Sequence, residues 1–155
     1  MKRSIILYTL IAVCLVGYAT RNYAQERKTG FNHVALSVYD LQKSASFYEN
    51  VLQLDTIPEP FKIGKHKWFK IGPGLSLHLI KDATEIIAHR RNTHICFSVA
   101  SIDQMTARLK EFGVKYYNAQ QEPDKVGTRV DGVHQLYIQD PDGYWIEIND
   151  ERMEL

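Results

Sequence analysis

Two segments of this chain repeat one pattern at a constant offset, and this repeat limits the fold more than any other feature. Residues 33–38 (HVALSV) and 94–99 (HICFSV) both begin with histidine, alternate apolar with smaller side chains and end in Ser-Val. The histidines are 61 positions apart (94 − 33 = 61). Repetition at a fixed period indicates a duplicated structural unit. A histidine at the same place in both copies predicts a metal site built with pseudo-twofold symmetry.

Each copy also closes in the same way. Residues 72–74 (GPG) precede the alternating segment 75–80 (LSLHLI), and residues 140–143 (DPDG) precede 144–149 (YWIEIN). Turn residues followed by alternating apolar residues predict a turn that leads into a strand. His78 and Glu147 occupy equivalent positions after these turns. The duplication therefore predicts four metal ligands, which are His33, His78, His94 and Glu147.

The strand period supports the same set of ligands. Side chains alternate between the two faces of a strand. His33 is therefore predicted to lie opposite Leu36, and Glu147 opposite Ile146 and Ile148. We expect the apolar faces to pack on helices. The opposite faces would line a common cavity with room for a metal and a substrate.

A predicted amphipathic helix follows each histidine strand. Asp40 can cap a helix that begins near Leu41, and Ser101 with Gln104 forms a capping box for the second helix, which ends at Gly113. Short strands follow near residues 55–57, 67–71 and 75–80, and again near 115–118, 134–139 and 144–149. Each copy is thus predicted to be a β-α-β-β-β module, at about residues 31–81 and 92–150 of a domain that spans residues 30–155.

The first 24 residues are typical of a secretory signal peptide. Lys2 and Arg3 precede an apolar run from residue 5 to about residue 19, and small residues follow up to Ala24. The apolar run is shorter than a membrane span of about 20 residues. We expect cleavage after Ala24 or Ala19, a periplasmic or secreted protein, and no stable membrane association afterwards. An uncleaved anchor that faces the same compartment is the alternative.

Composition excludes some classes of partner. The net charge of +1 gives no strong basic field, so no nucleic-acid partner is expected. The remaining chain is long enough for one domain with a substantial core. Removal of Cys14 would leave Cys96 as the one cysteine, which excludes an intrachain disulfide. Both a monomer and a homodimer are compatible with the sequence.

The chain resembles the vicinal oxygen chelate superfamily, also called the glyoxalase/bleomycin-resistance/dioxygenase superfamily, over about residues 31–150. The resemblance rests on residues 33–41 (HVALSVYDL), on Phe47 and Tyr48, and on residues 140–148 (DPDGYWIEI). It implies an α+β fold in which two tandem modules form an open cup-shaped barrel around one divalent metal. In this family the first and last strands of each module supply the ligands. Those positions are the four that the repeat predicts here.

The resemblance also implies a chemistry. Three histidines and one glutamate suit Zn²⁺, Fe²⁺, Mn²⁺, Ni²⁺ or Co²⁺ and do not select among them. A glyoxalase-like lyase or isomerase uses such a metal to hold two adjacent oxygens of a small substrate and to stabilise the charge that develops on them. Glu147 is the one carboxylate of the set, so it is the candidate catalytic base as well as a ligand. Glyoxalase I enzymes commonly carry glutamate at the position of His78, which makes this histidine a departure from the pattern.

Three alternatives stay open at this point. An Fe²⁺ extradiol-type dioxygenase would need two histidines and one glutamate, and could dispense with His78. A metal-independent antibiotic-binding protein of the bleomycin-resistance type would need none of the four ligands. A fosfomycin-type thiol or water transferase would use the same metal site. The partner is a small molecule in each case, and the candidates for binding it are Arg129, through its planar guanidinium, His134 and Trp68.

Overall fold

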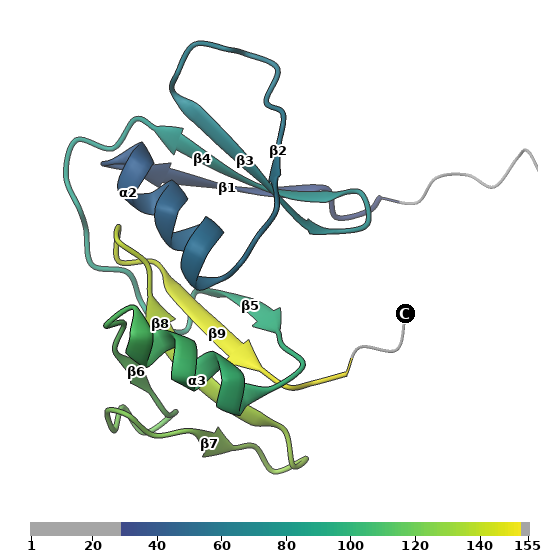
Figure 1. The fold of residues 1–155 in the computed structure, drawn as a ribbon, viewed down its shortest axis with the longest axis vertical. Helices are drawn as coiled ribbons and strands as arrows, with labels where there is room; N and C mark the ends of the chain where they lie inside the picture. The colour runs from purple at the N-terminus through teal and green to yellow at the C-terminus, as the bar shows by residue number, and fades with distance from the viewer. Residues whose placement is uncertain (1–28, 153–155) are drawn as a thin grey trace, which may run out of the picture. The chain divides into compact units, whose positions relative to one another are not determined.

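A computed structural model of the chain describes residues 29–152. The predicted signal peptide lies outside these residues. The structural unit considered below begins at Asn32, and its strands and helices form two modules, each with one sheet (Figure 1). In the part of the chain that is described, no helix is long and apolar enough to cross a membrane.

The first module follows the predicted β-α-β-β-β order. Its sheet has the strand order β1-β4-β3-β2, in which β1 runs parallel to β4 and the other neighbours are antiparallel. The elements are β1 (His33–Val38), α2 (Leu41–Ser46), the π-helix η1 (Phe47–Val51), β2 (Thr56–Ile57), β3 (His66–Gly72) and β4 (Leu75–Lys81).

The second module repeats this order with one addition. Its sheet has the order β5-β9-β8-β6, again with the first strand parallel to the last. The elements are β5 (His94–Ser98), α3 (Ile102–Glu111), β6 (Tyr116–Tyr117), β7 (Gly127–Thr128), β8 (His134–Gln139) and β9 (Trp145–Asn149). The extra strand, β7, has two residues, lies inside the polar loop of residues 120–131 and pairs with β8. The two sheets share no strand pairing among the described residues, so they form no closed barrel there.

The predicted helix caps are confirmed. The Asp40 side chain accepts hydrogen bonds from the backbone N–H groups of Gln42 and Lys43, at 3.0 and 3.1 Å. Ser101 Oγ accepts one from the N–H of Gln104 at 3.3 Å. After α3, Gly113 has φ of 64°, a left-handed conformation that ends the helix.

A helix covers the apolar face of each sheet (Figure 1). On this side of the first sheet Leu77 and Leu79 are fully buried, and in the second sheet Ile146 and Ile148 are fully buried. Each such side chain contributes about 1.5–3 kcal/mol to folding. Because strand side chains alternate, this packing directs the ligand positions to the opposite face of each sheet, which no helix of the described residues covers and which we call the uncovered face.

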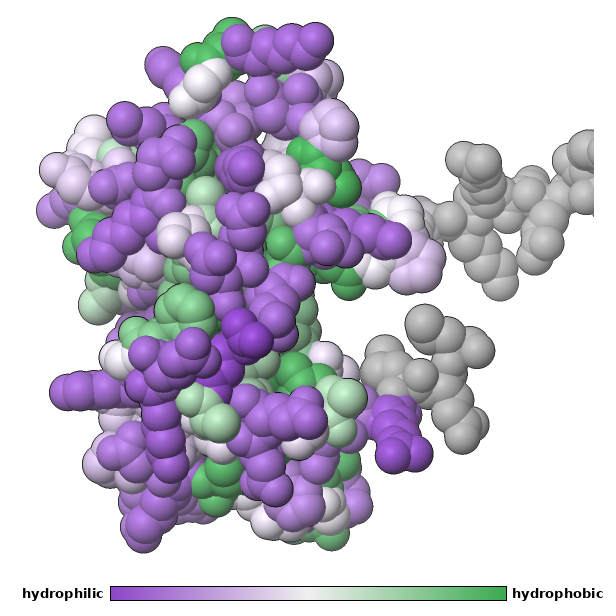
Figure 2. All heavy atoms as spheres, in the orientation of Figure 1, coloured by the Kyte–Doolittle hydropathy of each residue, from purple (hydrophilic) through white to green (hydrophobic). Residues whose placement is uncertain are grey.

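The side of the molecule seen in Figure 1 is predominantly polar. Figure 2 shows the same orientation, in which hydrophilic residues predominate and hydrophobic ones form small separate patches. Scattered patches of this kind are normal for a solvent-facing surface.

The turn between β8 and β9 joins the two modules through a buried carboxyl group. Asp140 Oδ2 accepts a hydrogen bond from the hydroxyl of Tyr48, which follows α2, at 2.8 Å. Asp140 Oδ1 accepts the backbone N–H groups of Asp142 and Tyr144 at 2.9 and 2.8 Å. Asp142 in turn accepts the N–H of Tyr39 at 2.7 Å. The predicted turn motif therefore also connects residues about 100 positions apart.

Asp140 is 5% exposed, and this burial raises the pKa of its carboxyl group to about 6, against the opposing effect of its hydrogen bonds. An unfolded aspartate titrates at about 3.9. A carboxyl group whose pKa is raised by folding stabilises the protein fully below the unfolded pKa, and this stabilisation is lost as the pH rises through the folded pKa. Asp140 should therefore make the protein less stable as the pH rises from about 4 to about 6.

We expect Asp140→Asn to remove this loss, because the amide keeps an oxygen for the two backbone N–H groups and carries no charge. The free energy of unfolding of the variant, relative to the wild type, should rise by about 1–3 kcal/mol between pH 4 and pH 7. Urea unfolding at several pH values in this range measures the difference. The exposed Asp55→Asn is the matched control, and a constant difference for Asp140→Asn across the range would contradict the prediction.

Candidate metal centre

The first module places three aromatic rings in one stack on its uncovered face. His78 pairs with Ala35 of β1 and with Trp68 of β3, so these side chains point to the same side of the sheet. The ring centroids of Trp68 and His78 are 3.7 Å apart with an interplanar angle of 3°, and those of His33 and His78 are 4.5 Å apart with an angle of 12°. Two of the four predicted ligands therefore lie side by side.

Both histidines of this pair have a nitrogen that is already hydrogen-bonded. Nδ1 of His33 lies 2.7 Å from Oδ1 of Asn32, and Nε2 of His78 lies 2.8 Å from Oγ of Ser76. An amide oxygen can only accept, so in the neutral ring of His33 Nδ1 carries the proton and Nε2 keeps its lone pair. Desolvation lowers the pKa of His78, and repulsion from the protonated forms of His33 and His66 lowers it further. The buried imidazole of His78 is thus favoured in its neutral form, which is the form that binds metals.

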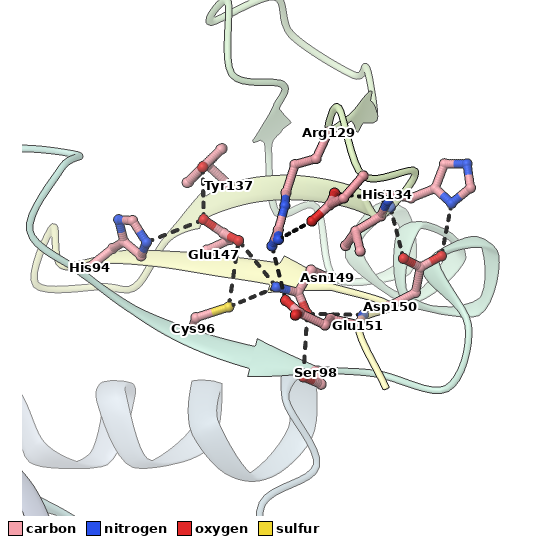
Figure 3. A network of polar contacts seen from close by, with 12 residues as sticks. His94, Cys96, Ser98, Arg129, His134, Tyr137, Glu147, Asn149, Asp150 and Glu151 are labelled. Carbon is pink, nitrogen blue, oxygen red and sulfur yellow. Dashed lines mark hydrogen bonds and ion pairs between the residues drawn. The ribbon is translucent and has the colours of Figure 1, made fainter. Parts of the chain in front are cut away.

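The second module brings His94 and Glu147 together (Figure 3). Nε2 of His94 lies 3.2 Å from Oε2 of Glu147, and the hydroxyl of Tyr137 donates to the same oxygen at 2.8 Å. Glu147 is 7% exposed, and strand register accounts for its neighbours, because it pairs with Cys96 of β5 and with Tyr137 of β8. Two predicted ligands again form an adjacent pair.

The ring of His94 has a defined orientation. Its Nδ1 lies 2.8 Å from the carbonyl oxygen of Arg91. A carbonyl oxygen accepts only, so this contact is a hydrogen bond when Nδ1 carries a proton, and Nε2 is the nitrogen that faces Glu147. A hydrogen bond between one ring nitrogen and a backbone carbonyl oxygen is characteristic of histidines that bind metals through the other nitrogen.

Neutral donors surround the other oxygen of Glu147. Oε1 lies 3.2 Å from Nδ2 of Asn149 and 3.6 Å from Sγ of Cys96. Desolvation, together with the charge of Glu147, raises the pKa of Cys96 to about 12, and desolvation and the hydrogen bond to Glu147 raise the pKa of Tyr137 to about 12. Both groups stay protonated at neutral pH. They can therefore orient the carboxylate as donors, and Cys96 is a poor nucleophile in this environment.

The four predicted ligands do not meet within one chain. In residues 29–152, no group of three or more His, Cys, Asp and Glu side chains gathers in a way that could hold a metal ion. His33 and His78 belong to one sheet, whereas His94 and Glu147 belong to the other. The structure thus contains two pairs of ligands, which we call the first and the second half-site.

The three predicted substrate-binding residues lie in different environments. Trp68 stacks on His78 in the first half-site. Both terminal nitrogens of Arg129 bind carboxylates, Nη1 that of Glu151 at 3.0 Å and Nη2 that of Asp131. Nδ1 of His134 lies 2.8 Å from the carboxylate of Asp150. Of the three, Trp68 alone contacts a predicted ligand, and the roles of Arg129 and His134 in substrate binding stay predictions.

Sequence reasoning did not identify the residues that orient the second half-site. Tyr137 could have been found, because a turn at residues 140–143 makes residue 137 the cross-strand partner of Glu147. Arg91 gave no usable signal, since Arg90-Arg91 looks like an ordinary solvated pair of basic residues. Its contacts come from segments that are distant along the chain.

We expect Tyr137→Phe to lower the free energy of unfolding by about 1–2 kcal/mol, because the buried carboxylate of Glu147 loses a hydroxyl donor. Tyr117→Phe is the matched control, since Tyr117 is half-buried on β6 and its hydroxyl has no hydrogen bond to any other residue that the structure describes. Chemical denaturation of both variants measures the two changes. Equal effects of the two substitutions would show that the bond to Glu147 contributes nothing to stability.

Comparison with known proteins adds independent information. Residues 30–148 match the Glyoxalase/Bleomycin resistance protein/Dioxygenase superfamily. The chain is 30% identical over 126 residues to a protein named Glyoxylase I 4 of Arabidopsis thaliana, covering 77% of this chain and 70% of that one. It is 28% identical over 150 residues to a lactoylglutathione lyase of Pseudomonas putida, covering 76% and 83%.

A solved structure is similar to this chain as well. It is a variant of the fosfomycin resistance protein FosX of Listeria monocytogenes in complex with Mn(II) and 1S,2S-dihydroxypropylphosphonic acid. The two chains are 26% identical with a TM-score of 0.64, and the match covers 83% of this chain and 94% of that one.

Proposed function

Because the chain belongs to the Glyoxalase/Bleomycin resistance protein/Dioxygenase superfamily, we propose that it is a divalent-metal-dependent lyase or isomerase of the glyoxalase type. The observation that carries this proposal is the second half-site, in which Nε2 of His94 and Oε2 of Glu147 face each other at 3.2 Å. The substrate is a small molecule that presents two adjacent oxygens to the metal. The relatives named as a glyoxylase I and a lactoylglutathione lyase support this class of reaction.

The residues fit a divalent cation. An imidazole nitrogen and a carboxylate oxygen are donors that Zn²⁺, Fe²⁺, Mn²⁺, Ni²⁺ and Co²⁺ all accept. The hydrogen bonds at Nδ1 of His33 and of His94 leave Nε2 of both rings available. Mn(II) in the FosX complex supports a divalent metal for this family, but it does not select the metal of this chain.

We propose that a second copy of the chain completes the metal site. Each half-site supplies two ligands, and His33 and His94 are exposed on faces that no helix within residues 29–152 covers. In a homodimer, His33 and His78 of one protomer would meet His94 and Glu147 of its partner. The two uncovered sheet faces would then form the wall of the cup that the family resemblance implies.

Catalysis follows from the residues around Glu147. A bound divalent metal supplies a Lewis acid that stabilises negative charge on the two substrate oxygens. Oε1 of Glu147 accepts the proton from the carbon next to the carbonyl group and returns it to the neighbouring carbon. Tyr137 and Asn149 hold the carboxylate in place through their donors at 2.8 and 3.2 Å. Trp68 and the stacked histidines form an aromatic wall on the other half-site.

A phosphonate substrate, like the ligand in the FosX complex, has less support in this chain. A phosphonate dianion needs cationic partners. Arg91 donates to two backbone carbonyl groups, and Arg129 binds two carboxylates. Each guanidinium group is therefore already directed at partners within the chain, and the charge of Arg129 is balanced by two carboxylates.

Export is part of the proposal and rests on residues 1–24 alone. Glutathione is chiefly cytosolic in bacteria, so a glutathione adduct is a poor candidate for the substrate of an exported enzyme. We therefore propose a chelating substrate other than the glutathione hemithioacetal. N-terminal sequencing of the protein from its producing cell should find a mature chain that begins at Gln25 or Thr20.

The protein should bind about one divalent metal per chain, and His33→Ala and His94→Ala should each lower the affinity at least tenfold. Metal analysis and titration calorimetry of protein prepared without a histidine tag measure both quantities. His66→Ala is the control, because His66 belongs to neither ligand pair. Stoichiometric metal in the double variant His33→Ala/His94→Ala would refute the site.

Mixing the two single variants tests whether the site lies between copies. If subunits reassociate at random, half of the dimers are mixed, and each mixed dimer has one intact site, so about a quarter of the wild-type metal capacity should return. A site built within one chain would give no recovery on mixing. A monomer with full metal occupancy would also exclude the shared site.

Glu147→Gln should lower turnover by orders of magnitude while part of the metal affinity remains, because the amide offers an oxygen but accepts no proton. The reaction of the wild-type enzyme should proceed without oxygen. A C–H proton of the substrate should exchange with solvent deuterium. Proton NMR in deuterated water and oxygen-electrode measurements check both points. Oxygen consumption that is stoichiometric with product, without deuterium incorporation, would favour the dioxygenase alternative.

A further inference from the structure

Arg91 connects three separate parts of the second module. Its guanidinium group donates to the carbonyl oxygen of Ala119 at 2.7 Å through Nη2 and to that of Asn118 at 3.3 Å through Nη1. The same group lies 5.1 Å from the centre of the Tyr137 ring, within the range of a cation–π interaction. The side chain of a residue in the turn before β5 is thus anchored to the segment after β6 and to β8.

The main chain of Arg91 orients the predicted metal ligand. Its carbonyl oxygen is the acceptor for Nδ1 of His94 at 2.8 Å. The turn that carries this carbonyl has one backbone hydrogen bond of its own, from Thr93 N–H to the carbonyl oxygen of Arg90 at 2.9 Å. The anchored side chain therefore holds in place the acceptor that the ring of His94 requires.

His94 has two acceptors but, in its neutral form, one proton. Arg91 O competes for this proton at Nδ1, and Oε2 of Glu147 competes for it at Nε2, 3.2 Å away. With the proton on Nδ1, Nε2 presents a lone pair to a metal ion. With the proton on Nε2, the ring binds Glu147 instead and cannot coordinate.

Both contacts of the Arg91 side chain favour the tautomer of His94 in which Nδ1 carries the proton. The bonds to Asn118 and Ala119 fix the carbonyl oxygen beside Nδ1. The contact with Tyr137 holds a ring whose hydroxyl already donates to Oε2 of Glu147 at 2.8 Å. Because Oε2 of Glu147 already accepts this hydrogen bond, it is a weaker acceptor for a proton on Nε2 of His94.

We propose that Arg91 is a positioning residue that selects the tautomer of His94 in which Nδ1 carries the proton, and so keeps Nε2 available for the metal. This inference rests on the proposed function, because it assigns His94 as a ligand of the metal. Arg91 itself is assigned no contact with the metal or the substrate. It acts through His94 and Tyr137.

Long-range ¹H–¹⁵N NMR of the metal-free protein, labelled at histidine, tests the proposal directly. The His94 signals are assigned by their loss in His94→Gln and recorded at about pH 8.5, where an ordinary imidazole is neutral. The wild type should show the Nδ1–H tautomer. Arg91→Ala should shift the ring toward Nε2–H, whereas Arg91→Lys, which keeps a cationic donor, should shift it less. Arg90→Ala is the control, because Arg90 is an exposed neighbour in the same turn.

Calorimetric titration with Mn²⁺ supplies a second measurement. Arg91→Ala should weaken binding about tenfold or more, and Arg90→Ala should leave it unchanged. A folded Arg91→Ala protein with the wild-type tautomer would overturn the proposal. If Arg91→Ala does not fold, the same comparison with Arg91→Gln decides, and an unchanged tautomer there overturns the proposal equally. A wild type that binds no divalent metal would refute the proposed function, while the NMR measurement would still decide the role of Arg91.

Discussion

The parallel pairing of the first strand of each module with its last strand brings every predicted ligand beside a partner. In the first module, β1 and β4 align Ala35 with His78, which leaves His33 close enough to stack on that ring. In the second, β5 and β9 align Cys96 with Glu147, and His94 reaches the carboxylate. A slip of one residue in either register would move a ligand to the face that the helix covers, where the apolar core leaves no room for a polar group. The proposed metal site therefore depends on two strand registers.

A second constraint is the buried turn at residues 140–143. It carries two carboxylates into the region where α2 meets the second module, and their hydrogen bonds to Tyr48 and to backbone N–H groups offset the cost of burying them. Gly143 has φ of +85°, and a Cβ atom there would lie 3.0 Å from the carbonyl oxygen of Ile87. This turn therefore has to combine polar partners with a residue that lacks a side chain. It begins the strand that bears Glu147, so one short motif contributes both to stability and to the site.

Much of the fold could be anticipated because the underlying signals are local. The strand β8 was predicted at residues 134–139 without error, and the caps at Asp40 and Ser101 follow from hydrogen bonds within a single turn. Elements that depend on packing were less predictable. The helix after β1 continues as the π-helix η1, whose wider turn buries both Phe47 and Tyr48, at 8% and 0% exposure. Strand β7 has two residues and exists through its pairing with β8, so periodicity could not reveal it.

The candidate site also has some features that follow from local sequence and others that depend on packing. The period of two along a strand is a property of the chain, and it was enough to assign His33, His78, His94 and Glu147 to polar faces before any packing was known. The separation of these residues into two half-sites is a property of the fold, because the modules form separate sheets and strand periodicity says nothing about how sheets are placed. The contacts of Arg91 with Ala119 and Tyr137 likewise require segments far apart in sequence to meet. Residue types and spacing specify which groups can bind a metal, whereas the long-range packing of the chain specifies which of those groups meet and which ring nitrogen would face a bound metal.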